Sequence, residues 1–432
     1  MVAPVRLGET FAPLSERPFR LLWLGRASSA AGDALMPLAV AFAVLSVDSS
    51  ATALGAVLAA FWISRVAFTL VGGVVSDRLP RRAVMLACDG FRACIEAFTA
   101  SMLLTHQMTL PIFIVTAGLF GTASAFFGPA SDGLVPQTIS AARLQSANAL
   151  LVITNNAMNL FGPAIAGILI ILTAPGWLFA VDSVSFLASA WFLMKLRIPA
   201  HERLPRSTFA HELRVGLHEV TSRRWVRAPI VGFAITNFCF AAFIVLGPVI
   251  AREQLGGARD WAIVSTCGAF GAIVGGFASM RLHPRKPLSF GFAATTLVGL
   301  PIAALAAPLP VAALAGAWGI GMASIALSNT YWETNLMRRI PQGVFARVRS
   351  YDILVSFVFM PLGFIAFPLI ARSLGDARTL LVAAIVAAGT SLAVALRPGV
   401  RAITDEPAEA LARTVVAEPG PPAASQVQPS SV

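Results

Sequence analysis

The chain has 432 residues, of which 57% are hydrophobic and 12% are charged, and its mean hydropathy is +0.76. This composition excludes a soluble globular domain and fits a protein embedded in a bilayer. The formal net charge of +11 would also fit a nucleic-acid-binding protein. The positions of the basic residues therefore have to decide between the two interpretations.

Twelve apolar stretches are long enough to cross a bilayer. Lipid offers the backbone N–H and C=O groups no partners, so each stretch is expected to be a helix of about 20 residues or more. The first is too long for a cleaved signal peptide and is expected to be a retained helix. The predicted spans are 20–46, 51–75, 83–105, 109–130, 146–172, 176–196, 229–251, 260–280, 288–307, 311–336, 350–372 and 377–396.

The basic residues follow the orientation rule of membrane proteins. With the N-terminus in the cytosol, only Arg252, Arg259, Arg372 and Arg378 of the 32 lysines and arginines fall in outside loops, and Arg26, Arg65 and Arg92 fall within spans. The remainder lie in cytosolic segments, and this asymmetry sets the orientation. We therefore expect a multi-pass protein of the inner (cytoplasmic) membrane with both termini cytosolic, and no nucleic-acid partner.

The spans divide into two halves. We expect an all-α membrane fold of two six-helix bundles, residues 1–196 and 229–396, joined by a cytosolic linker with an amphipathic helix, 197–228, and followed by a disordered cytosolic tail, 397–432. The halves look duplicated, because Ser76, Arg78 and Leu79 recur as Ser279, Arg281 and Leu282 at an offset of 203 residues. Such repeats place a substrate path between the halves.

Enzymatic chemistry is not expected. The only lysines, Lys195 and Lys286, do not lie in a phosphate-binding GxxxxGK[ST] loop, and HExxH, GxSxG and SxxK motifs are absent from the sequence. The four cysteines lie in predicted spans without metal or redox spacing. We therefore expect no enzyme activity, no metal and no cofactor other than a proton gradient.

Charged residues within the spans concentrate in the first half. Asp33 follows Phe19 by fourteen residues, which places it about 21 Å along the first helix and past the bilayer centre. Pairing with Arg26 or Arg65 would let this acid take up and release a proton. A static buried ion pair is the alternative.

The third helix carries a charged stripe of its own. Asp89, Arg92 and Glu96 are spaced i, i+3 and i+7 and so share one face. We expect a static role for Asp89 and Arg92, which lie closer to the cytosol, whereas Glu96 lies deeper and could join a proton path.

The fifth helix and several aromatic residues suggest a lined cavity. Pro163 is expected to kink the helix, while Gly162 and Gly167 permit close approach of another helix. Asparagines upstream would form a polar face. The expected cavity-lining residues are Trp62, Phe126, Asn155, Asn159, Asp182, Trp318 and Trp332.

The loop between the second and third spans, GVVSDRLPRR, resembles the Gly-x-x-x-Asp-Arg-x-Gly-Arg-Arg signature of the major facilitator superfamily. The matching residues are Gly73, Asp77, Arg78, Arg81 and Arg82, with Pro80 in place of the second glycine. GPAIAG, Gly162 to Gly167, is similar to the Gly-Pro signature of proton-coupled exporters of this superfamily. FRLLWLGRASSAAGD and VDSVSFLASA resemble the branch with macrolide efflux proteins and the enterobactin exporter.

The resemblance implies two six-helix bundles that rock between inward-open and outward-open states. It also implies that Asp77 lies at the start of the eleventh helix, expected near Ser350, and that a loop arginine pairs with Asp132. These contacts would hold the cytosolic gate shut. An arginine common in the fourth helix of drug exporters is missing here, so the charges of helices one to three would have to carry any proton coupling.

These features together predict a monomeric secondary transporter, whose partners are a small molecule and membrane lipid. The expected activity is export of amphiphilic, drug-like molecules by proton antiport. The alternatives are a dedicated exporter of one metabolite such as a siderophore or self-made antibiotic, an importer, and a non-transporting membrane sensor or scaffold.

Overall fold

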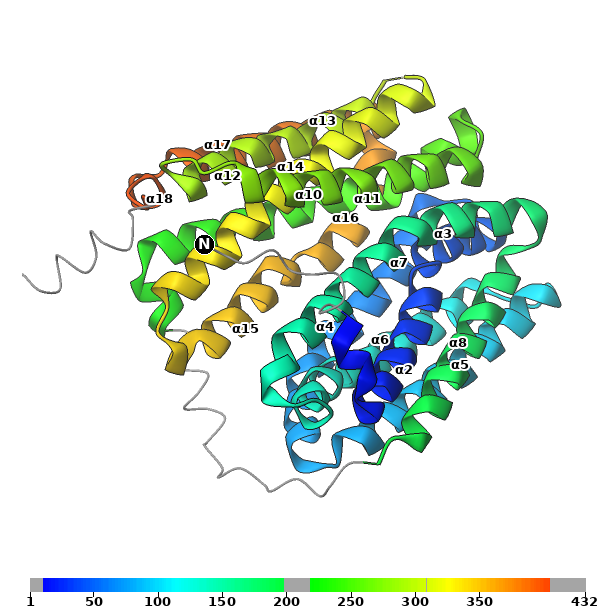
Figure 1. Ribbon diagram of the computed structural model, residues 1–432. Helices are drawn as coiled ribbons and strands as arrows, with labels where there is room; N and C mark the ends of the chain where they lie inside the picture. Colours follow the sequence, from blue (N-terminus) through cyan, green and yellow to red (C-terminus); the bar gives the residue numbers. More distant parts are fainter. Residues whose placement is uncertain (1–10, 198–217, 308, 405–432) are drawn as a thin grey trace, which may run out of the picture.

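The computed structural model describes residues 11–197, 218–307 and 309–404. Figure 1 shows two groups of helices that run side by side, the N-terminal half from blue to green and the C-terminal half from green to orange. Within these described ranges the regular structure is entirely helical. The predicted all-α membrane fold of two six-helix bundles is confirmed.

The N-terminal half consists of six membrane-crossing segments, the first of which is broken in two. Its helices are α2 (Arg17–Asp33), α3 (Met36–Val47), α4 (Ala51–Arg78), α5 (Arg81–Leu104), α6 (Leu110–Leu134), α7 (Leu144–Leu172) and α8 (Pro175–Lys195).

The C-terminal half repeats this plan, with breaks in its third and fifth crossings. Its helices are α10 (Arg224–Gln254), α11 (Ala258–Arg281), α12 (Pro287–Thr295), α13 (Gly299–Ala304), α14 (Val311–Arg339), α15 (Gln342–Val358), α16 (Met360–Leu374), α17 (Asp376–Leu396) and α18 (Pro398–Arg401). Arg78 and Arg281, which the predicted repeat relates, are each the last residue of a helix.

Eleven crossings in the described part of the chain are long and apolar enough to span a bilayer. The third predicted span, α5, falls outside this set because Asp89, Arg92 and Glu96 lie in its middle. It nevertheless belongs to the bundle, since it packs along α6 and α8. The charges of α5 are therefore enclosed by neighbouring helices rather than exposed to lipid.

Two helix breaks lie four residues before a proline. Pro37 has no N–H to donate to the carbonyl of Asp33, and α2 ends at Asp33. Pro361 likewise has no N–H for the carbonyl of Phe357, and α15 ends at Val358. The sequence prediction of one continuous helix over 20–46 and another over 350–372 is wrong at these points.

We call the side that carries residues 196–197, 218–223 and 397–404 the linker side, and the opposite side, with loops 48–50 and 255–257, the far side. The contacts that join the halves involve α3, α4, α7, α10, α11 and α16. At two of them a glycine lets the helices approach: a Cβ added to Gly55 would lie 2.1 Å from the carbonyl oxygen of Phe364, and one added to Gly167 would lie 2.3 Å from Cβ of Ala262.

Charged groups reinforce the far-side closure. The Arg252 guanidinium of α10 donates a hydrogen bond to the carbonyl of Leu45, near the C-terminus of α3, where the helix dipole is negative. In the adjoining loop, hydrogen bonds from the side chain and N–H of Ser50 hold the pKa of Asp48 below its usual value. Arg372 of the C-terminal half adds to this effect. The end of α3 thus offers negative charge to two arginines across the seam.

The predicted domain boundaries need one correction. Most of the predicted amphipathic linker helix, residues 198–217, lies outside the described residues, as do residues 405–432 of the predicted disordered tail. Residues 398–401, however, form α18, and Val400 and Ile403 are buried against the C-terminal half. The tail therefore cannot begin at 397, because these apolar side chains belong to the core.

We expect Gly55→Ala to weaken the far-side closure. The added methyl group would overlap the Phe364 carbonyl, and overpacking of this kind costs about 1–3 kcal/mol. With the native cysteines replaced and Asn155→Cys introduced on the linker side, labelling by a water-soluble maleimide should slow. Gly90→Ala is the control, because nothing lies within 4 Å of its added Cβ. Equal labelling of both variants would contradict the expectation.

Candidate functional site

Arg92 of α5 is the centre of a group of charges inside the N-terminal half. Its side chain is 3% exposed, and Nη2 lies 2.5 Å from Oδ1 of Asp89. Asp89 is held from the other side by the Ser189 hydroxyl of α8, which donates to Oδ2 at 2.7 Å. These contacts place Asp89 and Arg92 in one buried pair, whose static role stays a prediction.

Two phenylalanine rings enclose the Arg92 guanidinium. The Cζ atom lies 4.2 Å from the ring centroids of both Phe127 and Phe186, a distance typical of cation–π interaction. In a protein interior surrounded by lipid, the rings and Asp89 together offset the cost of removing the arginine from water.

Asp182 and Glu96 form the far-side end of the same group. Both are buried, and they are close enough to interact electrostatically. Oδ1 of Asp182 accepts a hydrogen bond from the Ser185 hydroxyl at 3.0 Å. Among the described residues, Oδ2 of Asp182 and Oε2 of Glu96 have no hydrogen-bond partner. A buried carboxylate without a partner is costly and in practice is neutralised, so these two acids can hold protons.

Asp33 is the acid of this group that reaches solvent. Its Oδ2 lies 3.9 Å from Nη1 of Arg92, and its side chain is 45% exposed. The neighbouring Gly32 packs directly on α8, since a Cβ there would lie 2.0 Å from Oδ1 of Asp182. Small residues thus bring α2 close enough for Asp33 to meet Arg92. We call Asp33, Asp89, Arg92, Glu96 and Asp182 the buried-charge group.

The predicted contact partners of Asp33 differ from those observed. Arg26, about two turns away along α2, pairs instead with Asp132 of α6 at 3.4 Å. Arg65 interacts with Asp33 electrostatically but is not within 4.0 Å of any acid in the described part of the chain. The sequence could not identify Arg92 as the partner, because that choice depends on how α2 and α5 are placed.

The arginines of the predicted gating loop cap helices of their own half. Arg82 donates from Nε and Nη2 to the carbonyls of Leu193 and Met194, both at 2.7 Å, at the end of α8. Arg81 donates to the carbonyl of Gly133 at the end of α6. Cations favour helix C-termini, so these residues stabilise the linker side of the N-terminal half.

The remaining residues of the predicted gate are Gly73, Asp77, Arg78 and Asp132. Asp77 and Arg78 end α4, and a Cβ added to Gly73 would meet nothing within 4 Å; the side chain of Asp77 lies outside the described set. The observed partner of Asp132 is Arg26. The helix expected to begin near Ser350 begins at Gln342, directly after Pro341. The predicted start of this helix is corrected accordingly, whereas the pairing of Asp132 with a loop arginine stays a prediction for the shut gate.

The fifth crossing confirms close approach at both of its glycines. A Cβ added to Gly162 would lie 2.5 Å from Cβ of Ala34, and Gly167 meets Ala262 of the other half. Pro163 lies inside α7, where it leaves the carbonyl of Asn159 without its usual donor. This helix therefore contacts both halves through glycine.

The asparagines of α7 face the space between the halves. At 100° per residue, Asn155, Asn156 and Asn159 fall on the stripe between Gly162, which contacts α2, and Gly167, which contacts α11. All three are exposed, although the same stripe is packed further along the helix. The linker side of the interface thus presents amide groups rather than an apolar surface.

The aromatic residues predicted to line a cavity differ in where their rings pack. Trp62 stacks on Phe357 of the other half, with ring centroids 5.9 Å apart, and Phe126 lies beside Phe68 between α4 and α6. In contrast, Trp318 stacks on Phe243 within the C-terminal half, at 4.1 Å.

The prediction that Asp182 and Trp332 line a cavity is wrong. Asp182 has no exposed surface and Trp332 is 2% exposed. Trp332 donates from Nε1 to Asp352 at 2.9 Å, so its ring and its polar atom are both used in packing the C-terminal half. Burial of these side chains reflects which helices meet, which residue type alone does not indicate.

The sequence analysis did not identify two residues that hold this region together. Ser189 donates a hydrogen bond to Asp89. Asp182, Ser185 and Ser189 have the same i, i+3, i+7 spacing as the charged residues of α5, and this shared spacing was the sequence signal for a polar face on α8. Phe357 forms the inter-half stack, and its only signal was its position four residues before Pro361.

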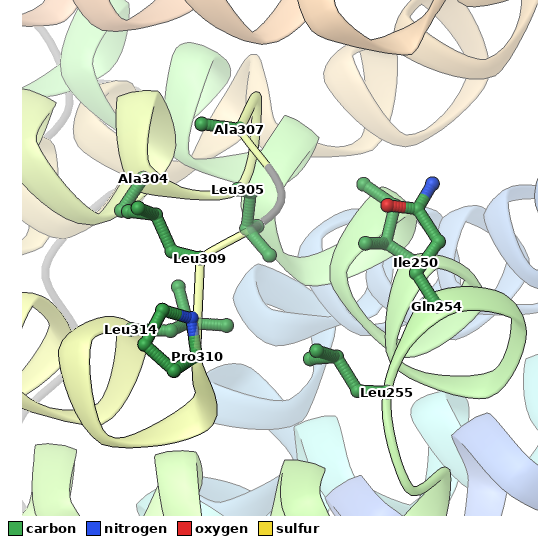
Figure 2. A pocket seen from close by; sticks show the side chains of 9 residues that line it. All are labelled: Ile250, Gln254, Leu255, Ala304, Leu305, Ala307, Leu309, Pro310 and Leu314. Atoms are coloured by element: carbon green, nitrogen blue, oxygen red, sulfur yellow. The ribbon is translucent and has the colours of Figure 1, made fainter.

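A separate hollow lies in the C-terminal half. A cavity of about 400 Å³ opens on the far side of the C-terminal half. Figure 2 shows Ile250, Gln254 and Leu255 on one side of it and Leu309, Pro310 and Leu314 across from them. Gln254 is the one polar side chain among its lining residues, so this cavity has no part in the charge chemistry of the N-terminal half.

Comparison with known proteins assigns the family. The model of the transmembrane secretion effector family, MFS_3, matches residues 8–429. The chain therefore belongs to this family, and the predicted membership in the major facilitator superfamily is confirmed.

Relatives and solved structures agree with this assignment. The chain is 24% identical over 293 residues to "Uncharacterized MFS-type transporter YkuC" of Bacillus subtilis, covering 63% of this chain and 67% of that one. It is 22% identical over 264 residues to macrolide efflux protein A of Streptococcus pyogenes, covering 60% and 65%. An auto-inhibited POT family peptide transporter superimposes with a TM-score of 0.71 at 14% identity, covering 90% and 98%.

We expect Asp89→Asn to destabilise the protein far more than Asp33→Asn. The first change leaves Arg92 buried with only the distant Asp33, and breaking a buried pair costs about 3–5 kcal/mol. The second removes a half-exposed carboxylate, which costs about 1 kcal/mol or less. Unfolding in detergent measures both, with Asp132→Asn as an exposed-pair control. A larger loss for Asp33→Asn would contradict this ranking.

Proposed function

We propose that this transporter exports amphiphilic, drug-like molecules across the cytoplasmic membrane by proton antiport. The observation that carries the proposal is the position of Asp33. It is half exposed to solvent, yet its carboxylate reaches the buried Arg92 at 3.9 Å. A proton can therefore exchange with water at a group whose charge is coupled to the interior of the N-terminal half.

The coupling follows from the charges around Arg92. When Asp33 is ionised, Arg92 is shared between Asp33 and Asp89. When Asp33 takes up a proton from outside, Arg92 is left to Asp89 alone, and the attraction between α2 and α5 weakens. Because Asp33 ends α2 at the proline break, this change acts where the helix is already interrupted. Glu96 and Asp182 extend the group and can hold further protons.

The direction of transport rests on the assignment of the linker side to the cytosol. Basic residues concentrate on that side, which supports this orientation. The closure of the halves on the far side then corresponds to an inward-open state, in which Asp33 releases its proton to the cytosol as substrate enters. The exposed asparagines of α7 and the ring of Trp62 offer polar and apolar contacts suited to an amphiphile.

The gating loop acts in the opposite state. Asp77, at the C-terminal end of α4, would meet the N-terminus of α15 when the linker side closes, since a helix N-terminus favours an acid. The protein would act as a monomer in lipid, with the proton gradient as its only energy source. The macrolide efflux relative supports a drug-like substrate class.

We expect the reconstituted protein to move a labelled macrolide across the vesicle membrane against its concentration gradient when a pH gradient is imposed. One proton exchanged per molecule across a two-unit gradient can sustain about a 100-fold concentration ratio. Asp33→Asn should abolish this accumulation but allow downhill exchange, because position 33 can then no longer take up and release a proton. Asp77→Asn should slow transport and preserve its dependence on the gradient.

Asp376→Asn serves as the matched control, because this residue begins α17 on the far side. Transport that ignores the gradient would overturn proton coupling. Normal accumulation by the Asp33 variant would overturn the role of that residue even if coupling persists.

A further inference from the structure

Arg65 of α4 is a charged residue that makes no direct contact with the acids of the buried-charge group. Within the described ranges, none of the acids lies within 4.0 Å of its guanidinium, whereas Arg26, Arg92 and Arg349 each have such a partner. Its Cζ lies 5.5 Å from the ring centroid of Trp62 and 5.8 Å from that of Phe61. An arginine at membrane depth normally faces a bundle interior or water and has a partner there.

The neighbours of Arg65 along α4 show which way it faces. Gly55 and Trp62 contact the C-terminal half, while Phe61 and Gly72 contact α6. At 100° per residue, Arg65 falls between these two seams. It is exposed, so its guanidinium reaches the space between the halves rather than lipid.

Trp62 fixes the depth of this position. One turn from Arg65 towards the far side, its ring stacks on Phe357 at an interplanar angle of 7°. A molecule that enters from the linker side therefore meets Arg65 next to the closed seam, with an aromatic surface beside it. Arg65 can supply the charge contact and the rings can supply the apolar contact.

We propose that Arg65 binds an anionic group, such as a carboxylate or sulfonate, on the transported amphiphile. The guanidinium offers five N–H donors in a planar fork that suits such groups. Arg92 is unsuited to the task, because its charge is met by Asp89 and its side chain is 3% exposed. This proposal rests on the proposed transport function, because it takes the bound anionic molecule to be the transported substrate.

Equilibrium binding to purified protein in detergent tests the site. Dansylglycine and its uncharged amide share one fluorophore and differ in the carboxylate. We expect the native protein to bind the acid roughly tenfold more tightly, the effect of hydrogen bonds to a charged group. Arg65→Gln should lower the affinity for the acid to that for the amide and leave the amide unchanged.

Two further variants complete the design. Arg65→Lys keeps the positive charge and should retain part of the preference for the acid, which keeps the test decisive if the glutamine variant fails to fold. Arg378→Gln, at the exposed start of α17, should behave as the native protein. Equal affinities of the native protein for both probes would overturn the proposal, as would an equal loss of both affinities in Arg65→Gln.

The two proposals can fail separately. Binding is measured without a gradient, so a preference for the acid alongside absent macrolide transport would overturn the proposed function and leave the site standing. Active proton-coupled transport with no preference between the probes would do the reverse.

Discussion

The charge of Arg92 constrains how the helices of the N-terminal half pack. A guanidinium enclosed by helices within a bilayer has to be neutralised by nearby groups, since water is not available. Asp89 and Ser189 supply one set of contacts from α5 and α8, Phe127 and Phe186 supply the rings, and Asp33 reaches in from α2. The packing of these helices and the position of the half-exposed acid are therefore parts of one arrangement.

Helix association in lipid cannot rely on the hydrophobic effect, so close packing at small residues takes its place. Gly32 allows α2 to approach α8, and Gly55 and Gly167 allow the halves to meet on the far side. Glycine contacts of this kind stabilise a closed seam without interlocking long side chains. Such a seam can separate and reform, which a transporter that alternates between states requires.

The two halves differ in chemistry despite their related plans. The N-terminal half encloses the buried-charge group and contributes Arg65 and the asparagines of α7 to the space between the halves. The C-terminal half contributes Phe357 and keeps its own acid, Asp352, engaged with Trp332 and Arg349 on the linker side. Charged and amide groups thus lie on one wall, and the opposing wall supplies aromatic contact at the seam.

The sequence was sufficient to predict the membrane fold, the twelve crossings and the concentration of charge in helices one to three, because backbone hydrogen bonding in lipid and residue spacing are local constraints. It also identified Gly162 and Gly167 as packing positions. The arrangement of the helices was needed to show that Asp33 meets Arg92 rather than Arg26, that Asp182 and Trp332 are buried, and that Arg81 and Arg82 cap helices. Those outcomes depend on the rotation and depth of each helix relative to its neighbours, which are set by contacts between residues far apart in the chain.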